Sequence, residues 1–190
     1  QYIFSLPNIG RVFTNTLVIA VAKIIFGTIM AIVVALLLNE CQNRILKRNI
    51  QTMIYFPYFI SWIILGGIMT DILSPSDGII NQIITFFGGE PVYFLGDNSI
   101  FPATLVVSDI WRNFGYNSIV YLAAITSIDP TLYEAAAIDG AGRWKQTWHI
   151  TLPGMSTIII LMCILSLGNV LNAGFDQVYN LYSVQVYESG

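Results

Sequence analysis

Long apolar runs alternate with short polar segments along this chain of 190 residues. A helix of about 20 apolar residues matches the thickness of a bilayer. Four runs of this kind predict membrane-spanning helices at residues 15–38, 52–73, 99–127 and 154–173. The expected fold is therefore an all-α membrane protein, a polytopic helical bundle that forms one transmembrane domain over residues 1–190.

The polar connections differ in their charge. Arg and Lys cluster in residues 39–51 and 129–153, whereas residues 74–98 and those after Gly174 contain neither. The positive-inside rule places the two basic segments in the cytoplasm and the other two segments outside. Glycines and prolines predict a loop over residues 74–98, with a short interfacial helix within it.

Composition agrees with a lipid environment. The chain is 55% hydrophobic and 10% charged, with a mean hydropathy of +0.69, whereas soluble domains carry about 25% charged residues. A net charge of −3 gives no reason to expect a nucleic-acid partner. Cys41 and Cys163 fall at different depths of the predicted bundle, so we expect no disulfide between them.

The polar segment 129–153 has strong helix signals. Asp129 suits the N-cap and Pro130 the first helical position, while Gly140 can end the helix in a left-handed C-cap. Consecutive alanines leave little side-chain bulk, so the backbone of another protein can approach closely. A second amphipathic piece places Trp144 and Trp148 on one face, either to anchor at the membrane interface or to contact a partner.

The third predicted span holds the best candidates for a substrate path. Charged residues inside a bilayer usually face the bundle interior or a water-filled cavity. Asp109 and Arg112 can neutralise each other at a spacing of three residues, and structural pairing between helices is the alternative to ligand contact. In the first span, Lys23 either extends toward the outer surface or pairs with an acid such as Asp109. The candidates are Asp109, Trp111, Arg112, Asn113, Tyr116 and Asn117.

Nothing in the sequence predicts an enzyme. The single histidine, His149, lies in a polar connection, and no His, Cys and carboxylate cluster has metal-ligand spacing. The chain also lacks the glycine-rich phosphate loop of ATP-hydrolysing proteins. We therefore expect neither catalysis nor a cofactor or metal in this chain.

The pattern E-A-A-x-x-D-G-A, followed by I-x-L-P, resembles the cytoplasmic EAA loop of permease subunits in binding-protein-dependent ABC importers. Thr147 stands where many members carry phenylalanine. Residues 55–62 and 175–182 look like the branch that imports complex sugars. The resemblance implies that the loop couples to an ATPase through Glu134, Ala135, Ala136, Asp139, Gly140 and Ala141.

This resemblance implies a maltose-type permease fold and ATP-driven import of an oligosaccharide or related sugar across a bacterial inner membrane. The implied partners are cytoplasmic ATP-binding subunits that hold ATP and Mg²⁺, a second permease subunit and an extracytoplasmic solute-binding protein. Family members have further spans on both sides, so we expect this chain, which begins at Gln1, to be part of a longer subunit. The rival hypotheses are an ion-gradient-driven secondary transporter or channel, and a membrane-embedded enzyme.

Overall fold

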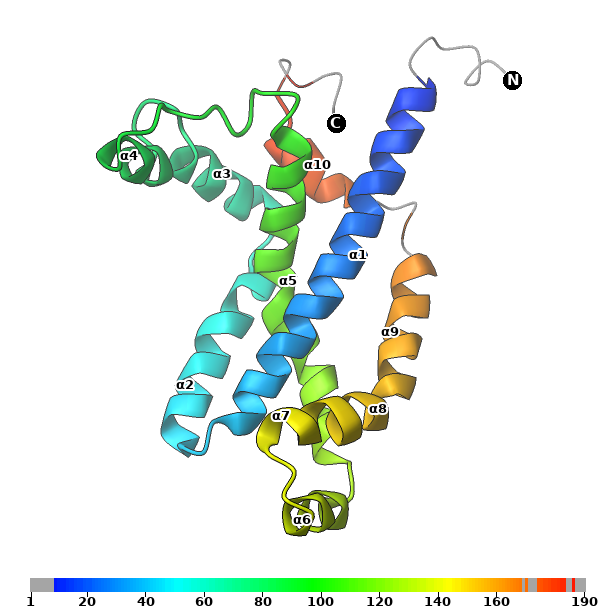
Figure 1. Ribbon diagram of the computed structural model, residues 1–190. Helices are drawn as coiled ribbons and strands as arrows, with labels where there is room; N and C mark the ends of the chain where they lie inside the picture. Colours follow the sequence, from blue (N-terminus) through cyan, green and yellow to red (C-terminus); the bar gives the residue numbers. More distant parts are fainter. Residues whose placement is uncertain (1–8, 169, 171–173, 184–185, 187–190) are drawn as a thin grey trace.

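The computed structural model describes residues 9–168, 170, 174–183 and 186, and in this part of the chain the regular structure is entirely helical. The predicted all-α class is thus confirmed. Two long helices, α1 (Ile9–Glu40) and α5 (Phe101–Thr126), lie side by side through the centre of the molecule (Figure 1). They overlap the residues of the first and third predicted spans.

Small and aromatic residues hold α1 and α5 together. Ala31 and Ala35 of α1 are completely buried, and their size lets the two helices approach closely. One apolar cluster forms toward the end of α1 and one near its beginning, and each joins both helices. The first comprises Ala31, Ala35, Tyr121, Ala124, Ile125 and Met155, and the second Ile19, Leu95, Phe101, Leu105, Leu181 and Val186.

The second apolar run is divided rather than continuous. It forms α2 (Arg44–Tyr55), a 3₁₀ turn η2 (Phe56–Phe59) and α3 (Trp62–Ile72), and the helices before and after the break are bent by 104°. A straight helix over residues 52–73 is therefore not what the chain forms. Pro57 lacks a backbone N–H and ends the α2 ladder, and Ser61 then caps α3 by accepting a hydrogen bond from the Ile64 N–H.

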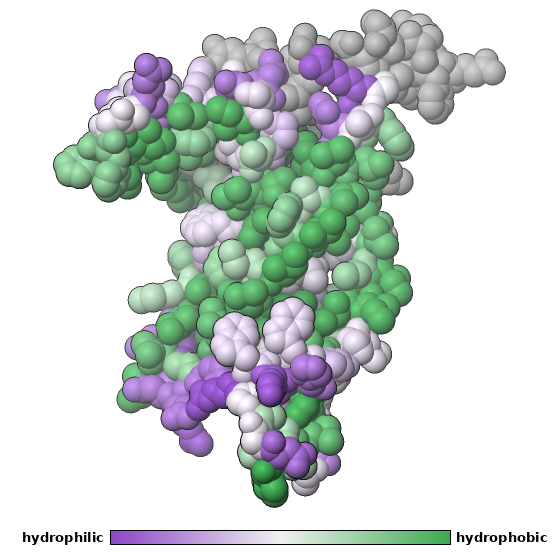
Figure 2. Space-filling view, in the orientation of Figure 1, coloured by the Kyte–Doolittle hydropathy of each residue, from purple (hydrophilic) through white to green (hydrophobic). Residues whose placement is uncertain are grey.

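A short helix, α4 (Ile79–Phe86), lies within the predicted loop at residues 74–98. Asn81 is 2% exposed and fixes the loop, because its side chain donates to the carbonyl oxygens of Ser74 and Val92 and accepts from the Val92 N–H. In Figure 2, polar side chains gather on the upper side of this region and apolar ones below it. The two-sided surface fits the predicted interfacial helix.

The polar segment 129–153 and the last apolar run complete the fold. A continuous helical stretch, Arg143–Gly154, meets the following helix at an angle of 57°. The fourth predicted span continues beyond Gly168 into residues outside the described part. The elements are α6 (Pro130–Ile138), α7 (Arg143–Gln146), a π-helical turn η3 (Thr147–Thr151), α8 (Leu152–Gly154), α9 (Ser156–Gly168) and α10 (Phe175–Leu181).

By length and composition, one described helix, Gly10–Glu40, can cross a membrane alone, and the number rises to three when each bent pair is taken as one span. Helix α5 has 26 residues, a length of about 39 Å. Because α5 carries several polar side chains, its mean hydropathy is too low for it to be counted among the helices that can cross a membrane.

The two basic connections lie at the same end of the molecule. Figure 1 shows the turn between α1 and α2 at the end that also carries α6, while α4, the beginning of α5 and α10 lie at the opposite end. This grouping agrees with the alternation that the charge pattern predicts. We call the end with α6 the basic end. We call the opposite end the acidic end, because its loop at residues 74–98 carries Asp77, Glu90 and Asp97 and no basic residue.

A close approach between α2 and α5 generates the first prediction. A β carbon at Gly115 would lie 2.0 Å from the carbonyl oxygen of Ile54, and a backbone oxygen cannot turn away. We expect Gly115→Ala to destabilise the fold by about 3 kcal/mol. Gly67→Ala, with nothing within 4 Å, is the matched control. Thermal unfolding monitored by size-exclusion chromatography measures both, and equal melting temperatures would contradict the packing.

Candidate functional site

A polar cleft separates the two apolar clusters. It has a volume of about 260 Å³ and lies between α1, α5 and α9. Asp109, Asn113 and Asn117 recur every four residues along α5, so they line it from one helix face. Its remaining polar side chains are Lys23 and Thr28 of α1 and Ser166 of α9.

Lys23 lies at the centre of the polar contacts. Its Nζ is 4.0 Å from Asp109 Oδ1 and donates a 2.6 Å hydrogen bond to Gln177 Oε1. The Lys23 side chain is 10% exposed and that of Asp109 is 23% exposed. A buried charge is stable only when it is paired. The predicted pairing of Lys23 with a neighbouring acid is confirmed, and the extended alternative is not what is observed.

Gln177 is a part of this network that the sequence analysis missed. It is completely buried on α10, and its Nε2 donates to the carbonyl oxygen of Leu105 and to Ser108 Oγ, both at 2.7 Å. One side chain therefore connects α1, α5 and α10. The available signal was its spacing of four residues from Leu181, which places both on the same buried helix face.

The other three candidates on α5 face away from the cleft. Tyr116 stacks on Tyr58 with ring centroids 3.8 Å apart, and Arg112 donates to the carbonyl oxygens of Tyr58 and Ile60. Trp111 lines an apolar cavity of about 550 Å³ between α3 and α5. Three of the six candidates, Asp109, Asn113 and Asn117, therefore lie together in the cleft. Asp109 pairs with Lys23 rather than with Arg112.

At the basic end, α6 has the predicted caps. Asp129 Oδ1 accepts a 3.0 Å hydrogen bond from the Thr131 N–H, and this bond holds the pKa of the Asp129 carboxyl below its usual range. Gly140 has φ +75°, and Ala141 N–H donates to Ala136 O while Gly140 N–H donates to Ala137 O. These bonds form a Schellman motif, which satisfies the last carbonyls of the helix.

Most of the predicted coupling residues are on the surface. Glu134, Ala135, Asp139 and Gly140 are exposed, and Ala136 and Ala141 are partly buried. Apolar side chains accompany them, since Ile138 is 87% exposed. The surface of α6 therefore combines the short side chains of its alanines with the exposed apolar side chain of Ile138. The carboxylates of Glu134 and Asp139 lie on either side of them in the sequence.

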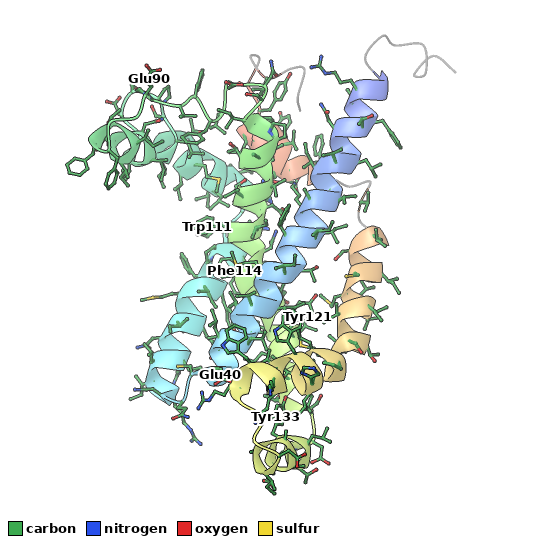
Figure 3. The ribbon with its side chains drawn as sticks, viewed as in Figure 1. Glu40, Glu90, Trp111, Phe114, Tyr121 and Tyr133 are labelled. Atoms are coloured by element: carbon green, nitrogen blue, oxygen red, sulfur yellow. The ribbon has the colours of Figure 1, made fainter. Side chains whose placement is uncertain are left out.

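Three side-chain contacts join this region to the body. Tyr133 Oη and Thr151 Oγ1 are 2.9 Å apart, and Gln146 Nε2 donates to the carbonyl oxygen of Ala141 at the same distance. Arg143 forms an ion pair with Glu40 at the end of α1. Figure 3 shows Glu40 and Tyr133 close to the same end, far from Glu90. The α6 segment is thus bonded to the α7–α8 helix, and that helix is joined through Arg143 to the end of α1.

Trp144 and Trp148 lie on the helical stretch above α6 and are 80% and 63% exposed. Their exposure agrees with both roles that the sequence left open. Cys41 and Cys163 are free thiols, as expected. Among the described residues, no group of three His, Cys, Asp or Glu side chains is placed to hold a metal ion.

Comparison with known proteins adds a family match. The family model described as "Binding-protein-dependent transport system inner membrane component" matches residues 23–175. The chain is 42% identical over 179 residues to the polygalacturonan/rhamnogalacturonan transport system permease protein YteP of Bacillus subtilis, covering 94% of this chain and 56% of that protein. Protein LplB of the same organism is 42% identical over 176 residues, covering 93% and 55%. The chain therefore spans little more than half the length of these curated relatives.

A solved structure has the same fold. It is described as a bacterial ABC transporter involved in the import of the acidic polysaccharide alginate, and one of its chains is 38% identical with a TM-score of 0.94. The match covers 99% of this chain and 66% of that one. A second structure shows the alginate transporter in complex with a periplasmic protein bound to an alginate pentasaccharide, again with a TM-score of 0.94.

The buried Gln177 network generates the second prediction. Gln177→Leu keeps the side-chain volume roughly constant but removes the acceptor 2.6 Å from Lys23 Nζ and the donor to Leu105 O, so we expect a loss of about 2 kcal/mol in stability. Asp176→Asn, an exposed change on the preceding residue, is the control. Hydrogen exchange of α10 amides measures local opening, and unchanged protection in Gln177→Leu would contradict this network.

Proposed function

This chain belongs to the family of binding-protein-dependent transport system inner membrane components, and we propose that it is a multi-pass permease subunit of an ATP-driven importer. Its proposed cargo is an oligosaccharide or a related sugar. The support comes from the relatives that are named for polysaccharide transport and from the likeness to the alginate transporter. The family is one of transport components, not of enzymes.

The observation that carries the proposal is α6 at the basic end. It is a capped, exposed helix with three consecutive alanines, and two side-chain hydrogen bonds join its segment to the α7–α8 stretch. We propose that it docks on a cytoplasmic ATP-binding subunit, which holds ATP and Mg²⁺, and that Glu134 to Ala141 make the contact. A rigid helix can transmit a displacement, whereas a flexible loop would absorb it.

We propose that the polar cleft is this subunit's share of the substrate path. Amide, carboxylate and hydroxyl groups from three helices converge on it, and such groups match the hydroxyls of a sugar. A second permease subunit would complete the path, and an extracytoplasmic solute-binding protein would deliver the cargo at the acidic end. The proposed topology of this part of the subunit keeps four crossings, the second of them made by the bent pair α2 and α3.

The rival hypothesis of ion-gradient transport needs an acid that can exchange protons or sodium ions within the membrane. Asp109 is the intramembrane acid among the described residues of α5, and Lys23 neutralises it. Uptake by the reconstituted transporter separates the two hypotheses. ATP-dependent uptake that survives dissipation of ion gradients supports the importer, and uptake that ends with the gradient overturns it.

The exposed position of α6 generates a prediction about contact. In a variant whose cysteines, Cys41 and Cys163 included, are replaced by serine, Ala135→Cys should cross-link to the ATP-binding subunit through a short bifunctional reagent. Gly89→Cys, equally exposed but at the acidic end, is the control. Cross-linking at Gly89→Cys with none at Ala135→Cys would mean that the topology is inverted.

The left-handed C-cap generates a prediction about transport. Gly140→Val places a β-branched residue at φ +75°, which such residues strongly disfavour. We expect uptake of labelled oligosaccharides by the assembled transporter to fall at least about tenfold, which corresponds to a loss of about 1.4 kcal/mol or more in coupling free energy. The amount of protein in the membrane should stay unchanged.

Gly140→Asn is the matched variant, because asparagine tolerates the left-handed conformation better than valine does. It should keep most of the uptake. Wild-type uptake by Gly140→Val would show that the conformation of this cap is unimportant for coupling.

A further inference from the structure

The break between α2 and α3 leaves backbone carbonyls without their helical partners. In a continuous helix, Tyr58 O and Ile60 O would accept from the N–H groups four residues later, at Trp62 and Ile64. Here the chain turns by 104°, and the Ile64 N–H donates to Ser61 Oγ instead. Within lipid no water replaces such partners, so these carbonyls need donors from the protein.

Arg112 of α5 supplies those donors. Its Nη2 donates to Tyr58 O at 3.0 Å and to Ile60 O at 3.1 Å, and its Nε donates to Ile60 O at 3.3 Å. The guanidinium carbon also lies 5.4 Å from the Tyr58 ring centroid and 5.1 Å from that of Trp62. One side chain therefore contacts residues before and after the point where the helix breaks.

From these contacts, we infer that Arg112 is the positioning residue that sets the angle between α2 and α3. A guanidinium carries five N–H donors in a rigid plane, so it can bond two carbonyls and stack on two rings at the same time. Lysine has a single ammonium and no planar face. The arrangement depends on this geometry as well as on the positive charge.

Pro57 accounts for the place of the break but not for its direction. A proline removes one N–H from the helix and displaces the preceding turn. The Pro57 carbonyl accepts a 3.2 Å hydrogen bond from the Ile60 N–H, which closes the 3₁₀ turn but does not reach α3. The contacts of Arg112 lie one and three residues after Pro57, at Tyr58 and Ile60, where the backbone changes direction.

The angle has consequences at both ends of the break. Tyr58 lies against Arg112 and stacks on Tyr116, so the position of this aromatic pair follows from the same contacts. On α3, Gly66 approaches Asn180 of α10 so closely that an added β carbon would be 3.1 Å from it. A change in the angle would therefore separate α3 from α10.

A distance measurement tests the inference directly. Spin labels at Ile45 on α2 and Ile72 on α3, both exposed, report the angle in the full-length subunit assembled in its complex in liposomes. Cys41, Cys163 and every other cysteine of the complex are replaced by serine, so that only these two positions carry labels. Two helical legs at 104° place the positions about 25 Å apart, whereas a straight helix would place them about 40 Å apart.

In Arg112→Met, which keeps the length of the side chain but has no donor, we expect the distribution to broaden and shift by roughly 5 Å or more toward the longer distance. Arg112→Lys should keep a larger bent population than Arg112→Met, because an ammonium still donates to one carbonyl. This difference between two variants of similar size separates positioning by hydrogen bonds from simple packing.

Val120→Ala is the control, since Val120 is an exposed residue of the same helix whose apolar side chain takes no part in the hydrogen bonds at the break. Its distance distribution should match that of the wild type. The inference is overturned if Arg112→Met retains the short distance, or if Pro57→Ala straightens the segment while Arg112→Met does not. Because the readout is a distance, failure of the proposed transport function would leave this test unaffected.

Discussion

The structure depends on one constraint, which is that a polar group placed in lipid must find its partner inside the protein. In the described part of the chain, every buried side-chain nitrogen or oxygen has a hydrogen-bond partner. The central case is Lys23, which the carboxylate of Asp109 and the amide of Gln177 hold between two apolar clusters. These bonds fix the register of α1 against α5 and bring α10 onto both.

Three faces of helix α5 contact three different environments. Its acid and two asparagines line the cleft, its arginine and tyrosine contact the break after α2, and its tryptophan faces an apolar cavity. These polar side chains lower the mean hydropathy of α5. For this reason α5 is not identified as a membrane span by composition, although it is long enough to be one. Its packing against α1 buries one face of the helix, while residues such as Val107 and Ile119 on other faces remain exposed.

Features set by neighbouring residues could be predicted from the sequence, and features set by distant ones could not. The caps at Asp129 and Gly140 depend on bonds within a few residues, so they are found where expected. The sequence did not predict that the chain turns sharply after Pro57. The carbonyl groups at this bend accept hydrogen bonds from Arg112, which is 52 or more residues away. Gln177 was missed for the same reason, since its partners Leu105 and Lys23 are distant in sequence.

The contacts at the basic end determine which parts of the molecule can follow a displacement of α6. Tyr133 bonds to Thr151 on the α7–α8 stretch, which continues through the 57° bend into α9. Arg143 on the same stretch pairs with Glu40 at the end of α1. Both α1 and α9 contribute walls to the polar cleft. A displacement of α6 can therefore reach all three helices that enclose the cleft. It reaches α1 and α9 through these contacts, and α5 through the short connection from Thr126 to Pro130.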